Sequence, residues 1–286
     1  MSYLIVMDAS ADIDSKVFLE EDIRFIPMQY SLNEEMRESK GIESEELLKS
    51  FYDSQRSGEL TKTTQITPYQ YINFFSKLLN EGYSILYLSL SSGLSSTYQS
   101  AMLAASELND EHKDEKVYVV DSLGATGGIG VLLELACKYR KEGKSIEENC
   151  ALLNNAKLKL HHFFMVQDLM YLKRGGRVSG ATAVVGTVLG IKPILKIDEN
   201  GKLVNFAKRR GNKLALEELA KLFNENYELN DSPIYIVDGD AKELGDFLAS
   251  EIKKIAPEAV VKRNMLSPII GAHTGPGLVA VCFIGK

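Results

Sequence analysis

The sequence predicts an α/β protein with two domains. In the first half, short apolar runs alternate with amphipathic helical patterns, an arrangement typical of a parallel sheet with helices on both faces. After about residue 158, strand-like runs outnumber helical ones, which predicts a mixed sheet covered by helices. We therefore expect a three-layer α/β/α domain with a mostly parallel sheet over residues 1–158 and a two-layer domain with a mixed sheet over residues 159–286. No linker rich in Pro, Gly or Ser lies between them, so we expect the two domains to pack together.

The elements of the first domain follow from the periodicity of its apolar residues. Short apolar runs predict strands at Leu4–Met7, Phe25–Tyr30, Ser84–Leu90 and Val117–Val120. Apolar residues at helical spacing predict helices at Ser44–Ser57, Pro68–Asn80, Thr97–Leu108 and Thr126–Lys141. Ligands bind beyond the carboxyl ends of parallel strands, so we expect functional residues in the turns at 8–12, 91–96 and 121–124.

The second domain reads mainly as strands. Apolar runs predict strands at Phe163–Val166, Ile191–Ile197, Leu203–Phe206, Ile234–Val237, Ala259–Asn264 and Val279–Phe283. Only two clear helices are expected among them, at Lys213–Asn226 and Lys242–Ile255.

Composition narrows the class of function. The net charge of −6 argues against binding along a nucleic-acid backbone, which needs a basic face. No stretch approaches the roughly 20 apolar residues that span a bilayer, so at most transient membrane contact is expected. The first residues are too few and too uncharged for a signal peptide. The three cysteines, Cys137, Cys150 and Cys282, form no metal or redox motif, which favours a cytoplasmic protein without a metal.

The turn from Leu90 to Ala101 carries five serines and a threonine between a predicted strand and a predicted helix. Free backbone N–H groups, the helix dipole and several hydroxyls at such a junction suit a small anion. Ser96 and Gln99 fit a capping box, which predicts Ser96 as the cap and Ser95 as the freer hydroxyl. The alternative is that these serines only cap the helix.

The common nucleotide and metal motifs are missing. Glycines 124, 127, 128 and 130 do not fit a dinucleotide fingerprint, and the segment 186–193 lacks the spacing and the Ser or Thr of a P-loop. We expect these glycines to allow tight turns or close packing. His161 and His162 are adjacent in a predicted strand and therefore face opposite sides, which makes them a poor metal site.

Two further kinds of segment are candidates for ligand or partner contact. His273 lies among three glycines and a proline in Gly271–Gly277, a predicted loop in which the backbone can approach a ligand and the histidine can donate to a carboxylate. Lys173–Arg177 and Lys208–Gly211 are predicted cationic turns, suited to phosphate, a carboxylate or an acidic partner surface. Solvated loops are the alternative for both kinds.

These motifs together resemble the DegV family, the fatty-acid-binding subunits of bacterial fatty acid kinase. The matching segments run in the expected order over nearly the whole chain: Asp8–Asp12, Thr63–Gln65, Leu94–Ala101, Asp121–Ser122, Leu172–Arg177, Ile191–Leu195, Arg210–Lys213 and Gly271–Gly277. The resemblance departs at Ser96, where the family usually has Gly, and at Ile66, where it usually has Pro.

The resemblance implies one long-chain fatty acid in an apolar tunnel between the two domains. It implies that Thr63, Ser95 and His273 hold the carboxylate, with Ser96 beside them, and that Arg177 and Arg210 face the kinase partner or the transferred phosphate. The chain would then be no enzyme itself and need no cofactor. An ATP-dependent kinase would phosphorylate the presented carboxylate, and this chain would carry the acyl phosphate to the acyltransferase machinery of phospholipid synthesis.

Two other classes of function stay open at this point. A lipid ester hydrolase would use Ser95 as nucleophile and His273 as base, although no G-x-S-x-G elbow surrounds Ser95 and no orienting acid is evident. A regulatory binder would respond to the lipid as an effector without coupling to a kinase.

Overall fold

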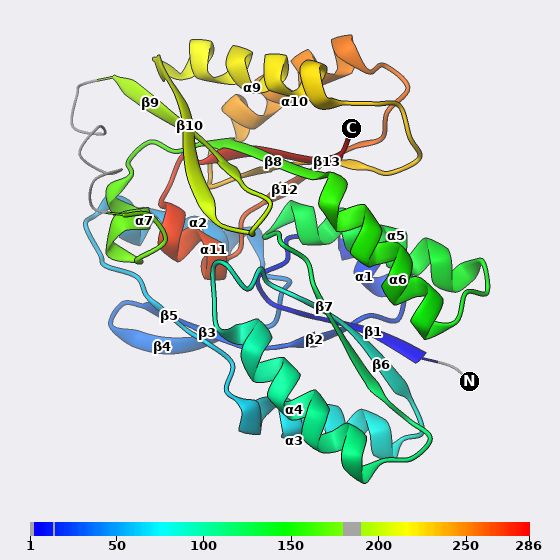
Figure 1. The fold of residues 1–286 in the computed structure, drawn as a ribbon. Helices are drawn as coiled ribbons and strands as arrows, with labels where there is room; N and C mark the ends of the chain where they lie inside the picture. Colours follow the sequence, from blue (N-terminus) through cyan, green and yellow to red (C-terminus); the bar gives the residue numbers. More distant parts are fainter. Residues whose placement is uncertain (1–2, 14, 180–189) are drawn as a thin grey trace.

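The computed structural model describes residues 3–13, 15–179 and 190–286. It contains a four-stranded sheet, a six-stranded sheet and a small three-stranded sheet. Figure 1 shows the four-stranded sheet in the lower part of the molecule and the six-stranded sheet above it. Part of the segment 186–193, which we compared with a P-loop, lies outside the described residues.

The four-stranded sheet is entirely parallel, as expected. Its strands lie in the order β2 (Arg24–Ile26), β1 (Tyr3–Asp8), β6 (Ser84–Ser89) and β7 (Val117–Asp121). In β1, Leu4 and Val6 join one buried cluster while Ile5 and Met7 join another, because successive strand residues face opposite sides. Helices therefore cover both faces of the sheet. One face carries α3 (Pro68–Asn80) and α4 (Thr97–Glu111), and the other carries α5 (Gly127–Lys141) and α6 (Ile146–Ala156).

The small sheet corrects one prediction. We expected a single strand at Phe25–Tyr30, but β2 ends at Ile26 and a separate strand begins at Met28. Pro27 lies between them and has no N–H to continue the pairing with β1. The small sheet has the order β4 (Glu35–Ser39), β3 (Met28–Leu32), β5 (Thr63–Thr64). In sequence, helix α1 (Ser15–Glu20) precedes β2, and helix α2 (Glu45–Arg56) lies between β4 and β5.

The six-stranded sheet is mixed, as expected. Its order is β10 (Leu203–Arg210), β9 (Ile191–Ile197), β8 (Leu160–Met165), β13 (Val279–Ile284), β11 (Ile234–Asp238), β12 (Val261–Met265), with only β11 and β12 parallel. The 3-10 turn η1 (Lys157–Lys159) precedes β8. Helices α9 (Asn212–Asn226) and α10 (Lys242–Ile255) cover one face, at the top of Figure 1.

Two short helices of the second half were not predicted, α7 (Met170–Arg174) and α11 (Pro268–Thr274). The expectation of a loop at Gly271–Gly277 was wrong for its first half, because α11 ends at Thr274. The expectation of a turn at Lys208–Gly211 was also wrong, since β10 continues to Arg210. Thus His273 lies in the last turn of a helix and Arg210 at the end of a strand.

The turn between β9 and β10 packs against the serine-rich turn that follows β6. Ser91 Oγ donates to the carbonyl of Gly201 over 2.8 Å. A Cβ on Gly93 would lie 2.5 Å from the same carbonyl oxygen, so only glycine allows this approach. A second link joins Asp12 to the start of α11, where the Ser267 N–H donates to its carboxylate over 2.6 Å. These contacts hold the two halves of the chain together around the space between them.

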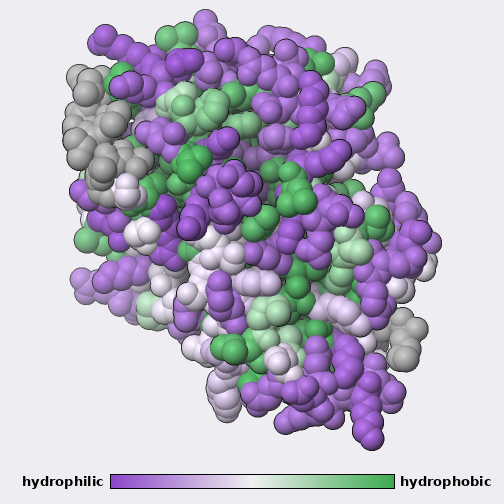
Figure 2. Space-filling model, in the orientation of Figure 1, coloured by the Kyte–Doolittle hydropathy of each residue, from purple (hydrophilic) through white to green (hydrophobic). Residues whose placement is uncertain are grey.

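In the part of the chain that the structure describes, no helix is long and apolar enough to cross a bilayer. Figure 2 shows a mostly hydrophilic face on which hydrophobic residues form small, separate groups.

Candidate functional site

A cavity of about 540 Å³ lies between the two sheets, and residues of both halves of the chain line it. This volume is in the range of small-molecule binding sites. Its wall is mainly apolar: Met28, Leu90, Leu94, Ala125, Phe164, Leu172, Ile197, Leu203, Leu266, Ile269, Ile270, Leu278, Ala280 and Cys282. The arrangement suits a long apolar ligand.

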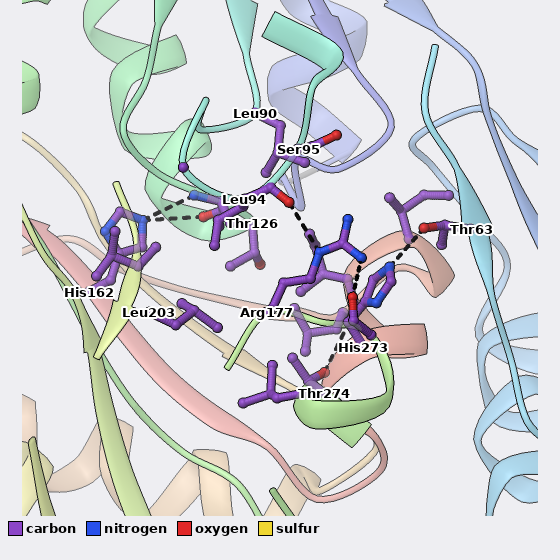
Figure 3. A pocket seen from close by; sticks show the side chains of 18 of the residues that line it. Thr63, Leu90, Leu94, Ser95, Thr126, His162, Arg177, Leu203, His273 and Thr274 are labelled. Carbon is purple, nitrogen blue, oxygen red and sulfur yellow. Dashed lines mark hydrogen bonds between the residues drawn. The ribbon is translucent and has the colours of Figure 1, made fainter. Parts of the chain in front are cut away.

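Polar groups gather at one end of this cavity (Figure 3). Thr63, from β5, and His273, from α11, lie 210 positions apart in sequence, yet Thr63 Oγ1 and His273 Nε2 are 2.7 Å apart and share a hydrogen bond. Arg177, which follows α7, lies beside them in Figure 3. The structure thus brings together three of the residues that the sequence singled out.

The backbone of Gly175 fixes the place of the His273 ring. A Cβ on Gly175 would lie 2.4 Å from His273 Nδ1, closer than side chains approach. The φ of Gly175 is −70°, so the glycine is needed here for space and not for backbone freedom. Burial, followed by the nearby positive charge of Arg177, lowers the pKa of His273 to about 4. The imidazole is therefore neutral at pH 7 in the absence of a bound anion.

Arg177 supplies the positive charge at this end. Its Nε donates to the carbonyl of Leu94 over 3.0 Å, and its Nη1 donates to the carbonyl of Gly175 over 2.5 Å. Burial lowers the pKa of the guanidinium. None of the described residues that line the cavity is an Asp or a Glu. A partly buried guanidinium with no acidic partner among the described residues favours an anionic ligand.

The serine-rich turn differs from its prediction. Ser96 is the residue before α4, but its side chain makes no capping hydrogen bond. Instead, the Ser95 hydroxyl accepts from the Thr97 N–H over 3.2 Å and shares a hydrogen bond of 2.8 Å with the Thr97 hydroxyl. The expected capping box at Ser96 and Gln99 is therefore wrong, and Ser95 is not the freer hydroxyl. Ser95 and Ser96 both line the cavity, so a role for them in binding a carboxylate stays a prediction.

Arg210 does not join the cluster. Its side chain is exposed at the end of β10 and is not part of the cavity wall. A role in contact with a partner stays a prediction.

Asp8 and Asp12, in the turn after β1, hold the backbone around the cavity through hydrogen bonds. The buried Asp8 carboxylate accepts from the Tyr87 hydroxyl over 2.6 Å and from the Leu90 N–H over 3.2 Å, which ties the end of β1 to the start of the serine-rich turn. Asp12 accepts from the Thr126 hydroxyl over 2.5 Å as well as from Ser267. Neither aspartate lines the cavity, so both position the surrounding backbone.

His161 and His162 face opposite sides of β8, as expected. His161 packs with Phe163 and Phe283, whereas His162 lines the cavity. Within residues 3–13, 15–179 and 190–286, no group of three or more His, Cys, Asp or Glu side chains could hold a metal ion.

Sequence reasoning did not identify Gly175 as the residue beside His273. It also assigned Arg177 to the kinase partner or the phosphate, whereas the structure shows Arg177 beside His273 and Thr63. The double glycine in Lys173–Arg177 was visible, and it signals a place where another group approaches the backbone closely. That the approaching group is His273 depends on a contact between distant parts of the chain, which no local pattern reveals.

Comparison with known proteins agrees with this arrangement. The family model described as DegV matches residues 2–286. A DegV domain-containing protein of Clostridium perfringens, CPE0026, is 35% identical over 285 residues, which cover 99% of this chain and 97% of that protein. A crystal structure of a DegV lipid-binding protein from Thermotoga maritima aligns over 100% of both chains, with 30% identity and a TM-score of 0.86.

Two further solved structures are described by their ligand. One is a second protein of Thermotoga maritima, described as having a fatty acid binding function, with 30% identity and a TM-score of 0.85. The other is a fatty-acid-binding DegV family protein of Thermus thermophilus, with 28% identity and a TM-score of 0.85. Each alignment covers 100% of both chains. From the match of the family model over residues 2–286 and the relatives at 30% identity or more, this chain belongs to the DegV family.

Proposed function

We propose that this protein binds one long-chain fatty acid in the cavity between its domains and presents the carboxylate to an ATP-dependent fatty acid kinase in the cytoplasm. It then carries the acyl phosphate to the acyltransferase machinery of phospholipid synthesis. One observation carries the proposal: the cavity is apolar along its wall and cationic at one end, with no acidic side chain among its described lining residues.

The apolar wall accounts for affinity. Burying each methylene group contributes roughly 0.8 kcal/mol, so a long acyl chain gains far more than a short one. Part of this gain offsets the lost freedom of the ligand and of the groups that it orders. The described relatives that bind fatty acids or lipids share the fold over their whole length, which supports the same class of ligand here.

The polar end accounts for the orientation of the lipid. A buried carboxylate without partners costs several kcal/mol. In the tautomer that carries its proton on Nε2, His273 donates to Thr63 Oγ1 and leaves the Thr63 hydroxyl to donate to the carboxylate, and the Arg177 guanidinium supplies charge. The carboxylate therefore belongs at this end and the acyl tail along the apolar wall.

The kinase partnership rests on the resemblance of the sequence and on the exposed cation at the end of β10. Arg210 lies outside the cavity and is free to meet a partner surface. The short cationic segment Lys173–Arg177 adjoins the head-group end. The positive charge of Arg210 and Lys173–Arg177 favours contact with an acidic surface, and the proposed partner is a kinase that binds ATP and Mg²⁺.

The geometry favours a binder over a hydrolase. His273 shares its Nε2 with Thr63, and Ser95 shares its hydroxyl with Thr97, so the nucleophile and the base are each engaged elsewhere. A serine hydrolase needs these two side chains within hydrogen-bonding reach of each other.

Binding is tested with lipid-free protein and a saturated or monounsaturated fatty acid, with the affinity measured by calorimetry. We expect Thr63→Val to weaken binding by about 1–3 kcal/mol, because the buried anion loses one hydroxyl. Ser250→Ala is the control, since it removes an exposed hydroxyl on α10 that is not part of the cavity wall. Equal affinity for wild-type protein and Thr63→Val, or no binding at all, would contradict the proposed site.

The kinase step is tested separately with a cognate kinase, ATP and Mg²⁺, with acyl phosphate as the readout. We expect Arg210→Ala to bind fatty acid as the wild-type protein does and to support less acyl phosphate formation. Lys221→Ala removes another exposed cation, on α9, and is expected to leave both measurements unchanged. If the wild-type protein binds fatty acid but never supports acyl phosphate formation, the regulatory binder becomes the better interpretation.

A further inference from the structure

A second histidine lines the cavity at a distance from the head-group end. His162, from β8, lines the cavity together with Ala125 and with Cys282, its cross-strand neighbour on β13. Figure 3 shows His162 on the side of the cavity opposite to His273 and Thr63. If the carboxylate lies beside His273, the end of the acyl tail lies toward His162.

Two glycines of the first domain hold the His162 ring. A Cβ on Gly128 would lie 1.8 Å from Nε2, and a Cβ on Gly124 would lie 2.8 Å from Cε1. Nε2 also lies 3.4 Å from the Ala125 nitrogen and 3.3 Å from the Ala125 oxygen. The ring is therefore fixed against the start of α5, and the glycine cluster serves close packing, as the sequence predicted.

The chemistry of the ring suits the end of an apolar tail. Its side chain is 3% exposed, and Nδ1 has no hydrogen-bond partner among the described residues. Burial lowers the pKa of His162 to about 4, so the ring is neutral at pH 7. The neutral His162 ring, with Nδ1 unpaired within the described part of the chain, therefore affects a ligand mainly by the space that it occupies in the cavity.

A second cavity of about 430 Å³ lies on the other side of this ring. It shares His162 and Ile197 with the first cavity. The rest of its wall is apolar on one part, with Leu123, Leu160 and Phe163, and charged on another, with Lys157, Lys196, Asp198, Glu199 and Glu225. His162 and Ile197 therefore have the first cavity on one part of their surface and the second on another. We expect removal of the His162 imidazole to open the first cavity into the second.

We propose that His162 is the stop that sets the longest acyl chain the protein accepts. The inference rests on the proposed function, because it needs a fatty acid whose carboxylate is held beside His273. An acyl chain that fits stops at the ring, and a longer chain must leave methylene groups out of the apolar wall or displace the ring from its glycines.

The experiment compares wild-type protein with His162→Ala. Both are stripped of lipid and titrated with saturated fatty acids from myristic to behenic acid, with the dissociation constant measured for each. The wild-type affinity is expected to rise with chain length and then to stop rising. In His162→Ala the rise is expected to continue to longer acids, by about four-fold for each methylene that enters the opened space.

His161→Ala is the matched control, because His161 lies next along β8 and lines only the second cavity. It is expected to keep the wild-type length profile. If His162→Ala does not fold, His162→Val removes the ring with a residue that suits a strand, and its profile is expected to shift in the same direction.

The outcomes separate the two proposals. A length profile that stays the same in the folded His162 variant, whatever its overall affinity, overturns the role of His162 and leaves fatty acid binding intact. A wild-type protein that binds no acid of the series overturns the proposed function and this inference together.

Discussion

Replacing Gly175 with alanine tests the head-group end without removing any polar side chain from the cavity wall. The His273 ring lies between Gly175, whose Cβ would come within 2.4 Å of Nδ1, and Thr63, whose hydroxyl is 2.7 Å from Nε2. Ordinary contact begins near 3.4 Å, so the ring must move by about 1 Å. It cannot retreat toward Thr63, because that hydrogen bond is already short. The ring must therefore rotate, and the bond to Thr63 is lost.

The magnitude follows from the loss of one positioned partner of a buried anion, about 1–3 kcal/mol. This corresponds to a dissociation constant about 5- to 150-fold larger for Gly175→Ala. The backbone of Gly175 has an ordinary φ of −70°, so alanine adds no backbone strain. Gly143→Ala is the control: its φ of +78° makes alanine unfavourable, but a Cβ there meets nothing within 4 Å and the residue is not part of the cavity wall. It is expected to lose stability and to keep its affinity.

A double-mutant cycle with His273→Ala shows whether the effect passes through the ring. Once the imidazole is gone, Gly175→Ala has nothing to displace, so the double variant is expected to bind as His273→Ala does. Calorimetry of the four proteins with one fatty acid gives the coupling. The reasoning is refuted if Gly175→Ala binds like the wild-type protein, or if the two substitutions add.

Three other predictions concern stability and protonation. Burial raises the pKa of Asp12 from 3.8 to about 6, so its contribution to stability is present below pH 3.8 and is lost as the pH rises through 6. Denaturant unfolding between pH 4 and 7 is expected to show a loss of up to about 3 kcal/mol relative to Asp12→Asn, and parallel curves would contradict it. Gly93→Ala, whose Cβ would meet the backbone carbonyl of Gly201 at 2.5 Å, is expected to lower stability by about 1–3 kcal/mol and to weaken fatty acid binding; wild-type values for both would refute the contact. NMR titration is expected to show that a bound fatty acid raises the pKa of His273 and not that of His162, and a shift at both would contradict the orientation of the lipid.

In the first half of the chain, the strands β1, β6 and β7 and the helices α2 to α5 were predictable because their signals are local, whereas α1, α6 and the strands β4 and β5 were not predicted. Helix α3 begins and ends where the sequence predicts, since Thr67 and Gln70 form a capping box and Pro68 suits the first turn. The buried strands of the parallel sheet are continuous apolar runs, which identify them without any knowledge of their neighbours. What periodicity could not give was the break at Pro27, which divides one apolar run between two sheets.

The candidate site was less predictable because its glycines are required by contacts with residues that are distant in sequence. Gly271 was read as part of a loop, but a Cβ there would lie 2.6 Å from the Tyr52 hydroxyl, so the glycine allows α11 to pack against α2. Short helices such as α11 depend on tertiary packing more than on local propensity. The same holds for Ser95, whose hydroxyl is taken by Thr97 rather than left free beside a capping Ser96. The pairing of Thr63 with His273 followed only from the resemblance to a family.

The two cavity histidines show how one residue type can serve both ends of a lipid. Burial lowers the pKa of each to about 4, so both are neutral at pH 7. Their surroundings separate them: His273 lies beside a hydroxyl and a guanidinium, whereas His162 lies against glycines and faces an apolar wall. A carboxylate stabilises the charged form only of the imidazole it approaches, so the head group has one favourable end. In the proposed complex, hydrogen bonds fix the head group and the His162 ring limits the tail. The distance between His273 and His162 would then set the length of the acid that fits.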